Sequence, residues 1–251
     1  MAEHLKILRV GTRKSALAKA QTNWVVKRLQ SFHPGLEIEI KEVVTTGDKM
    51  LDISFDNMLD KGVFVKEIEE QLLAGAIDLA VHSMKDLPTE CPDGLIIGAT
   101  PERADPRDVL VTKLNVNLDE MPDGARIGTS SLRRKAQLAH LRPDFEIIPI
   151  RGNIDTRLGK AESDDYDGII LAAAGLSRMG WLDRVHEFLS CSMMIPAVGQ
   201  GALGIEVREN DGRTLRLIEP LTDSKTEMAV KAERAFLSGM GGGCQTPMGA
   251  L

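Results

Sequence analysis

Short apolar segments alternate with amphipathic segments along most of the chain, and this alternation constrains the fold more than any other feature. Residues 5–10, 77–81, 125–128, 168–172 and 203–208 have the apolar character of buried strands. The segments between them repeat apolar residues with a helical period. The first predicted helix has Leu17, Ala20, Trp24, Val25 and Leu29 on one face, a later one carries Leu132, Leu138 and Leu141, and the last spans about residues 226–237. Strands that alternate with helices form a sheet with helices on its faces. The sequence therefore predicts an α/β fold.

The length of 251 residues allows two domains and part of a third. Proline and charge accumulate over residues 101–108, which suits a crossing between domains. The segment 203–208 has the pattern of a strand that returns to the first domain. We expect the following division: residues 1–101 and 201–221 in domain one, 102–200 in domain two, and 222–251 at the start of domain three.

The composition excludes several classes of protein. A net charge of −6 argues against a nucleic-acid-binding protein, because such domains usually carry a basic excess. No apolar run has the length of a membrane span, and the first ten residues lack the core of a signal peptide. The three cysteines fit neither a disulfide framework nor a zinc site. We expect a cytoplasmic protein without a metal.

Cationic and hydroxyl side chains gather at the predicted strand ends. In an open α/β sheet, ligands bind beyond the carboxyl ends of the strands, where helix N-termini present free N–H groups. A single arginine at such a turn is as easily explained by a solvent-exposed helix face. Five turns are enriched in cationic and hydroxyl residues, however, and this indicates a surface that binds carboxylates or phosphates. The residues are Arg13, Ser15, Ser83, Lys85, Thr129, Ser130, Ser131, Arg133, Arg134, Arg151 and Arg157.

Asp86 is an acid among these cations. It either forms a salt bridge with Lys85 or a nearby arginine, or offsets positive charge that develops on a substrate nitrogen or shuttles the proton of that nitrogen. His82 and His140 are possible bases, but the sequence gives neither of them a partner. We interpret His82 as a positional residue and His140 as a surface residue.

Cys244 lies in the glycine-rich string GGGCQTP near the end of the chain. A thiol in such a loop has little to pack against, which indicates that it is displayed for chemistry. Cys91 and Cys191 have no motif around them, and we expect them to be buried small hydrophobic residues.

Taken together and in order, these strings resemble the porphobilinogen deaminase (hydroxymethylbilane synthase) family. The resemblance runs from Arg9 to the end of the chain and is carried by VHSMKDLPT, DPRDVLV, IGTSSLRR, RGNIDTRL, PAVGQGALGIE and GGGCQTPMG. It implies two domains like type 2 periplasmic binding proteins and a third α/β domain. It also implies a transferase of tetrapyrrole and haem biosynthesis that joins four porphobilinogen molecules, loses ammonia each time and releases hydroxymethylbilane. Such enzymes are monomers that bind neither membranes nor nucleic acids.

The resemblance also implies roles for individual residues. Cys244 would carry the dipyrromethane cofactor through a thioether, and Asp86 would be the catalytic acid that stabilises positive azafulvene intermediates. Cofactor binding would also involve Ser15, Lys85, Thr129, Ser131, Arg133 and Arg134. Substrate binding would involve Arg13, Arg151, Arg157, Arg178, Gln200 and Lys61.

The chain departs from the family pattern at two places. Asn57 stands where a lysine is often found in the loop before Lys61, which predicts a weaker attraction of this loop for substrate. The chain also stops at Leu251, whereas the family normally continues. We therefore expect an incomplete third domain, a poorly anchored Cys244 loop and weak or absent activity. The alternative function is a small-anion binding protein on a two-lobed scaffold, which explains the arginines but not Cys244.

Overall fold

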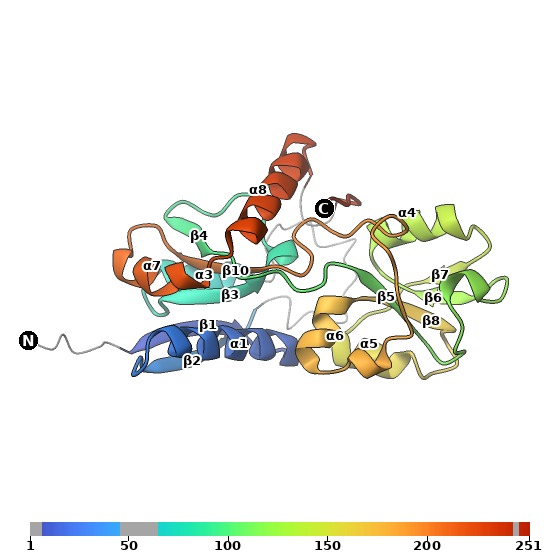
Figure 1. Cartoon of the computed structure of the whole chain (residues 1–251), viewed down its shortest axis with the longest axis horizontal. Helices are drawn as coiled ribbons and strands as arrows, with labels where there is room; N and C mark the ends of the chain where they lie inside the picture. Colours follow the sequence, from blue (N-terminus) through green and yellow to red (C-terminus); the bar gives the residue numbers. More distant parts are fainter. Residues whose placement is uncertain (1–6, 46–64, 243–245) are drawn as a thin grey trace, which may run out of the picture. The chain divides into compact units, whose positions relative to one another are not determined.

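A computed structural model describes residues 7–45, 65–242 and 246–251 of the chain (Figure 1). The residue contacts divide the chain into two units. Unit 1 comprises Met1–Arg103 and Ala202–Ala232, and unit 2 comprises Ala104–Gly201 and Glu233–Leu251. Each unit contains one mixed sheet of five strands among the described residues, which confirms the α/β class.

The sheet of unit 1 has the strand order β2-β1-β3-β10-β4. Its strands are β1 (Leu8–Arg13), β2 (Ile38–Val43), β3 (Leu79–Ser83), β4 (Leu95–Ala99) and β10 (Leu203–Arg208). β1 is parallel to β2 and β3, whereas β10 is antiparallel to β3 and β4. A strand more than one hundred residues away thus enters the sheet beside β3.

Helices cover both faces of this sheet. On one face, Val25 and Leu29 of α1 (Ala16–Phe32) pack with Leu79 and Val81 of β3. On the other face, α3 (Lys66–Leu73) packs Ile68 and Leu72 against Ala80. The alternation of residues 79, 80 and 81 between the two cores follows from the two-residue period of a strand. The helix α7 (Gly212–Ile218) adds Ile218 to the first core.

The sequence pattern placed the apolar face of α1 wrongly. We expected Leu17, Ala20, Trp24, Val25 and Leu29 on one buried face, but Trp24 is 42% exposed. The buried face includes Gln21 and Thr22 instead, because each has a polar partner inside the fold. Thr22 donates to Oγ1 of Thr12 at 2.8 Å, and Gln21 donates to Ser83 at 2.9 Å.

Unit 2 repeats the arrangement with the strand order β7-β6-β8-β5-β9. Its strands are β5 (Asp108–Thr112), β6 (Arg126–Gly128), β7 (Glu146–Ile148), β8 (Gly168–Ala172) and β9 (Glu187–Phe188). β6 is parallel to β7 and β8, whereas β5 is antiparallel to β8 and β9. One face packs against α5 (Ile154–Lys160) and α6 (Ala173–Met179), and the other packs against α4 (Leu132–Leu141).

The last helix, α8 (Ser224–Gly239), is longer than the predicted segment 226–237. The boundary between the two units falls within it, after Ala232. Its apolar side chains are only partly covered, since Met228 is 69% exposed and Phe236 is 50% exposed. Among the described residues, no helix has both the length and the apolar character that crossing a membrane requires.

Candidate functional site

The predicted site residues of unit 1 lie at the carboxyl ends of β1 and β3. Arg13 is the last residue of β1, and Ser15 caps the N-terminus of α1 by accepting a hydrogen bond from the backbone of Ala18 at 3.3 Å. Asp86 ends a short 3-10 helix (Met84–Asp86) that directly follows β3. Two neighbouring parallel strands therefore bring together residues separated by about seventy positions in the sequence.

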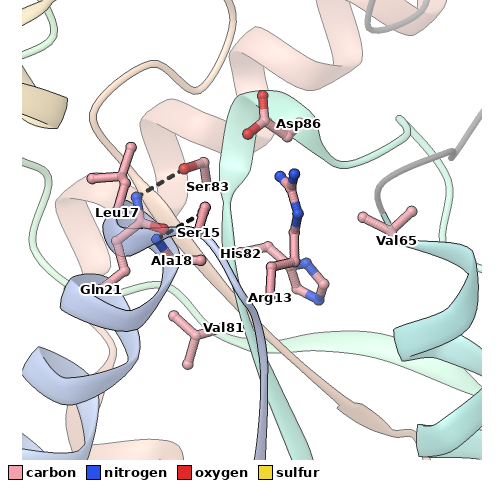
Figure 2. Close-up of a pocket in the computed structure, with 10 residues that line it drawn as sticks. All are labelled: Arg13, Ser15, Leu17, Ala18, Gln21, Val65, Val81, His82, Ser83 and Asp86. Atoms are coloured by element: carbon pink, nitrogen blue, oxygen red, sulfur yellow. Dashed lines mark hydrogen bonds between the residues drawn. The ribbon is translucent and has the colours of Figure 1, made fainter. Parts of the chain in front are cut away.

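These residues line a pocket with a cavity volume of about 60 Å³. Figure 2 shows the Arg13 side chain extending toward Asp86, with Ser15, Ser83 and Gln21 on one side and His82 on the other. This volume holds one or two water molecules. The pocket therefore suits a polar group of a ligand.

The structure gives His82 a partner that the sequence did not reveal. Its Nε2 atom lies 3.1 Å from Oε2 of Glu206, a residue of β10, and both side chains are buried. The local sequence contains no signal for this pair, because β10 joins β3 only in the folded sheet.

The predicted site residues of unit 2 follow β6. Ser131 caps α4 by accepting a hydrogen bond from the backbone of Arg134 at 3.4 Å. Thr129 accepts one from the backbone of Ser131 at 3.2 Å. Arg133 and Arg134 occupy the first turn of α4 and are both buried. Leu132, which the pattern assigned to the apolar face of this helix, is 59% exposed.

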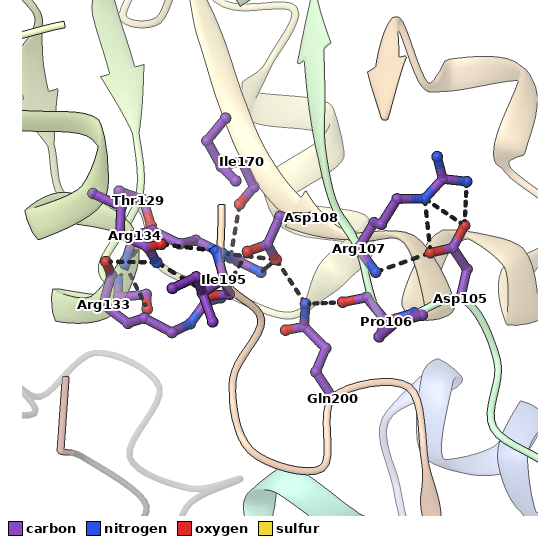
Figure 3. Close-up of polar contacts among 12 residues, drawn as sticks. Asp105, Pro106, Arg107, Asp108, Thr129, Arg133, Arg134, Ile170, Ile195 and Gln200 are labelled. Carbon is purple, nitrogen blue, oxygen red and sulfur yellow. Dashed lines mark hydrogen bonds and ion pairs between the residues drawn. The ribbon is translucent and has the colours of Figure 1, made fainter. Parts of the chain in front are cut away.

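A buried carboxylate explains why the two guanidinium groups point inward. Asp108, at the start of β5, is fully buried and pairs with Arg133 at 2.8 Å and with Arg134 at 2.7 Å (Figure 3). Gln200 donates to the same carboxylate at 2.9 Å and to the carbonyl of Pro106 at 2.7 Å. Asp108 was missed as a site residue, although the string DPRDVLV contains it.

The charges of this cluster do not cancel, because two guanidinium groups share one carboxylate. Burial alone would raise the pKa of Asp108, but Arg134 and Arg133 outweigh it and hold that pKa below its ordinary value. Burial also lowers the pKa of Arg133, against the opposing effect of Asp108. The Nε atom of Arg133 is buried and has no hydrogen-bond partner among the described residues. A surplus cation with an unsatisfied donor indicates a site for an anion.

Arg178 adds a third, partly buried cation to unit 2. It lies in the last turn of α6 and donates to the carbonyl of Gly201 at 2.6 Å. Burial lowers the pKa of Arg178 to about 10, and no described carboxylate pairs with it. Gly201 is suited to this position because its φ is +87° and an added Cβ would lie 2.5 Å from the carbonyl oxygen of Ala104.

The structure describes most, but not all, of the remaining predicted residues. Arg157 donates through Nε to the carbonyl of Gly152 at 2.8 Å, and Arg151 lies between β7 and α5. Lys85 lies beside Asp86 and is partly buried. Lys61 and Cys244 lie outside the described residues. Cys91 and Cys191 are only partly buried, so the prediction that both are core residues was too strong.

Sequence profiles of two protein domains match the chain. The profile described as "Porphobilinogen deaminase, dipyromethane cofactor binding domain" matches residues 8–216. The profile described as "Porphobilinogen deaminase, C-terminal domain" matches residues 228–251.

Curated relatives give the same result at high identity. A porphobilinogen deaminase of Bacillus subtilis is 57% identical over 97% of this chain and 78% of its own length. One of Syntrophotalea carbinolica is 55% identical over 97% of this chain and 77% of its own length.

Solved structures resemble the fold at low sequence identity. The methionine-binding protein MetQ superposes with a TM-score of 0.53 at 12% identity, over 91% of this chain and 95% of its own. A methionine-binding lipoprotein of Bacillus subtilis has a TM-score of 0.52 at 14% identity, over 90% of this chain and 94% of its own. These likenesses show the periplasmic-binding-protein type of fold and nothing about the ligand.

Proposed function

The chain belongs to the porphobilinogen deaminase family, and from this membership we propose that it joins four porphobilinogen molecules head to tail and releases linear hydroxymethylbilane. Ammonia leaves at each condensation. The reaction makes the protein a transferase of tetrapyrrole and haem biosynthesis. The function as a small-anion binding protein is not favoured, since only the fold, at 12–14% identity, points to it.

The observation that carries the proposal is the surplus of buried positive charge at the strand ends of unit 2. Arg133 and Arg134 share Asp108, and Arg178 has a carbonyl as its partner. Porphobilinogen carries two carboxylates, so linked pyrroles form a growing polyanion. Guanidinium groups bind carboxylates through paired N–H donors, and a buried donor without a partner gains most from such a ligand.

The same features fit the dipyrromethane that gives the matched domain its name, because that group also carries acid side chains. We propose that Cys244 holds it covalently and that Ser15, Lys85, Thr129, Ser131, Arg133 and Arg134 surround its acid groups. The unsatisfied Nε atom of Arg133 and the capping hydroxyl of Ser131 support this assignment. When bound, the group supplies the pyrrole carbon to which the first substrate is joined.

We assign the substrate carboxylates to Arg13, Arg151, Arg157, Arg178, Gln200 and Lys61. Arg134 has a second role, since it donates to Asp108 and to the carbonyl of Ile170. Arg134 therefore supports α4 as well as adding positive charge. Gln200 likewise ties the segment before β10 to Asp108.

Asp86 is the catalytic carboxylate in this proposal. When ammonia leaves porphobilinogen, positive charge develops on the pyrrole, and a carboxylate fixed nearby stabilises it. Asp86 lies at a strand end in a polar pocket, and Arg13 extends toward it (Figure 2). In this proposal Arg13 binds a substrate carboxylate while Asp86 faces the pyrrole nitrogen.

We propose further that the third domain begins near residue 222 and that the protein acts as a cytoplasmic monomer. The separate profile match over residues 228–251 supports the start of a further domain. Cys91 and Cys191 form no disulfide within the described part of the chain, which suits a reducing compartment.

The mass of the intact protein tests the central assignment. The purified chain should be heavier than its sequence by two linked pyrroles, and Cys244→Ser should remove both the added mass and the turnover of porphobilinogen. Cys91→Ala and Cys191→Ala serve as controls and should retain both. An adduct that persists in Cys244→Ser would disprove the attachment site.

A further inference from the structure

A buried histidine–carboxylate pair links β3 to β10 in unit 1. In the antiparallel register, Gly204 faces His82 and Glu206 faces Ala80. Residues two apart on a strand share a face, so His82 and Glu206 are diagonal neighbours on one side of the sheet. It is the side that α3 covers, and Ala80 there packs into an apolar cluster. The side chains of His82 and Glu206 are 4% and 1% exposed.

Two further charged residues lie near this pair, Glu69 of α3 and Arg13 of the adjoining pocket. Glu69 of α3 belongs to the same electrostatic environment, because burial, followed by the charge of Glu206, raises the pKa of Glu69 to about 7, while His82 opposes the shift. Neither oxygen of Glu206 has a hydrogen bond within the part of the chain that the structure describes. A buried carboxylate needs a cationic or donor partner. The imidazole ring is the group placed to provide one.

The ring also reaches the pocket that contains Asp86. His82 lines this pocket together with Arg13, Ser83 and Asp86 (Figure 2). Nε2 is the nitrogen that faces Glu206, and Nδ1 lies on the other edge of the ring. The pair therefore extends from the apolar layer under α3 to the place where the proposed chemistry occurs.

The proposed reaction releases a proton that the site must accept. The C–N bond of one porphobilinogen breaks, and its electron pair leaves with ammonia. The α-carbon of another unit forms the new C–C bond. Its C–H bond then breaks, the electron pair returns to the pyrrole ring, and a proton is released. Ammonia takes up a proton in water, so the balance needs no other reactant.

Asp86 alone is poorly suited both to stabilise the positive charge of the pyrrole and to accept the released proton. A carboxylate that stabilises a positive pyrrole must remain ionised, and it loses that charge when it accepts the proton. A second acceptor in the same pocket removes this conflict. An imidazole whose far nitrogen faces a buried carboxylate is suited to the task, because the carboxylate stabilises the imidazolium that forms.

We propose that His82 accepts the proton released at each condensation and that Glu206 is the residue that positions its ring. Glu206 holds a proton on Nε2, which leaves Nδ1 as the acceptor on the pocket side. The 3.1 Å contact lacks the alignment of a hydrogen bond. Catalytic hydrogen bonds often align only when substrate is bound. The inference rests on the proposed function and adds a residue pair to it.

The test compares porphobilinogen with and without deuterium at its free α-carbon. His82→Asn and Glu206→Gln should lower kcat on the order of 100-fold, with little change in KM. Both should show a primary isotope effect on kcat that the wild type lacks, because loss of the proton becomes rate-limiting. The controls are His140→Asn and Glu209→Gln, which change an exposed histidine and an exposed carboxylate close to β10. They should behave as the wild type.

A second measurement does not depend on turnover. The ¹⁵N signal of His82 Nε2 should move in Glu206→Gln and stay in place in Glu209→Gln. A slow His82→Asn enzyme without an isotope effect would overturn the proposal, as would an unchanged Nε2 signal in Glu206→Gln. If Glu206→Gln fails to fold, the isotope effect in His82→Asn still shows whether His82 accepts the proton. A wild type that neither carries two linked pyrroles nor turns over porphobilinogen would instead refute the proposed function, and the inference with it.

Discussion

Arg134 donates through Nε and Nη2 to the same carboxylate oxygen of Asp108, at 3.2 and 2.7 Å. Its Nη1 donates to the carbonyl of Ile170 at 2.8 Å. Three contacts thus fasten the first turn of α4 to β5 and β8, although the sequence indicates only a cation at a strand end. Arginines with the same sequence signal therefore differ in their internal partners, and we expect this difference to affect the stability and the activity of their variants in different ways.

Asp108→Asn should destabilise unit 2. Removing the charge leaves two buried guanidinium groups without a carboxylate, and breaking a buried ion pair in this way costs about 3–5 kcal/mol. Urea unfolding should show the loss. Asp164→Asn is the control, since Asp164 pairs with Lys113 at the surface, where solvent screens the pair. Equal stability of the two variants would show that the Asp108 cluster does not support the fold.

The same carboxylate should make the stability depend on acid pH. The pKa of Asp108 lies below its ordinary value of 3.8 in the folded protein. Its contribution is therefore fully present above about pH 4 and is lost as the pH falls through the folded pKa. In unfolding experiments between pH 7 and pH 3, Asp108→Asn should differ most from the wild type at pH 7.

Arg178→Gln should lower activity without lowering the stability of the fold, in contrast to Asp108→Asn. Burial lowers the pKa of Arg178 to about 10, so the folded protein holds this charge at a cost. Without substrate, the variant should be as stable as the wild type or more stable by roughly 1–2 kcal/mol. Its kcat/KM should fall about 10- to 100-fold through the lost carboxylate contact. A clear loss of stability with normal kcat/KM would make Arg178 a structural residue.

Asp86→Asn should retain the fold and lose catalytic activity. The amide has the shape of the carboxylate but not its charge, and groups of this electrostatic kind contribute on the order of 100-fold or more in rate. We expect a thermal melt close to that of the wild type and a collapsed kcat. Asp93→Asn, an exposed change shortly after in the chain, is the control. Near-normal turnover of Asp86→Asn would reduce Asp86 to a salt-bridge partner.

Glu69→Gln should stabilise the protein at neutral and alkaline pH. Burial and the charge of Glu206 raise the pKa of Glu69 from 4.5 to about 7. The folded state therefore binds more protons than the unfolded state between these values, and stability falls as the pH rises through them. At pH 8 the variant should gain about 1–2 kcal/mol, allowing for partial exposure of the side chain. At pH 4 it should gain nothing.

The exposed neighbour Glu70 provides the control for this prediction. Glu70→Gln should leave the free energy of unfolding unchanged at both pH values. If Glu69→Gln and Glu70→Gln respond alike, Glu69 does not titrate in a buried environment.

Local pattern predicted the elements well and the burial of their side chains less well. The strands 168–172 and 203–208 have the expected bounds. The amphipathic period found α1 but placed Trp24 inside, where Gln21 and Thr22 are buried instead. In α4 it favoured Leu132, although Arg133 and Arg134 are the buried residues. Hydrophobic periodicity fails at these positions because polar side chains can be buried once a partner satisfies them.

The sequence by itself determined the α/β class, the family and the row of cations at the strand ends. The fold class follows from the spacing of apolar residues, and the family and the cations follow from contiguous sequence motifs. None of these features needs a long-range contact to be recognised. Only the tertiary structure decided which cations have internal partners and which acids are buried. Asp108 lies 26 positions from Arg134 and 92 from Gln200, and β10 brings Glu206 to His82 across 124 positions. Partners at such separations are chosen by strand order and register, and no local property of either residue encodes them.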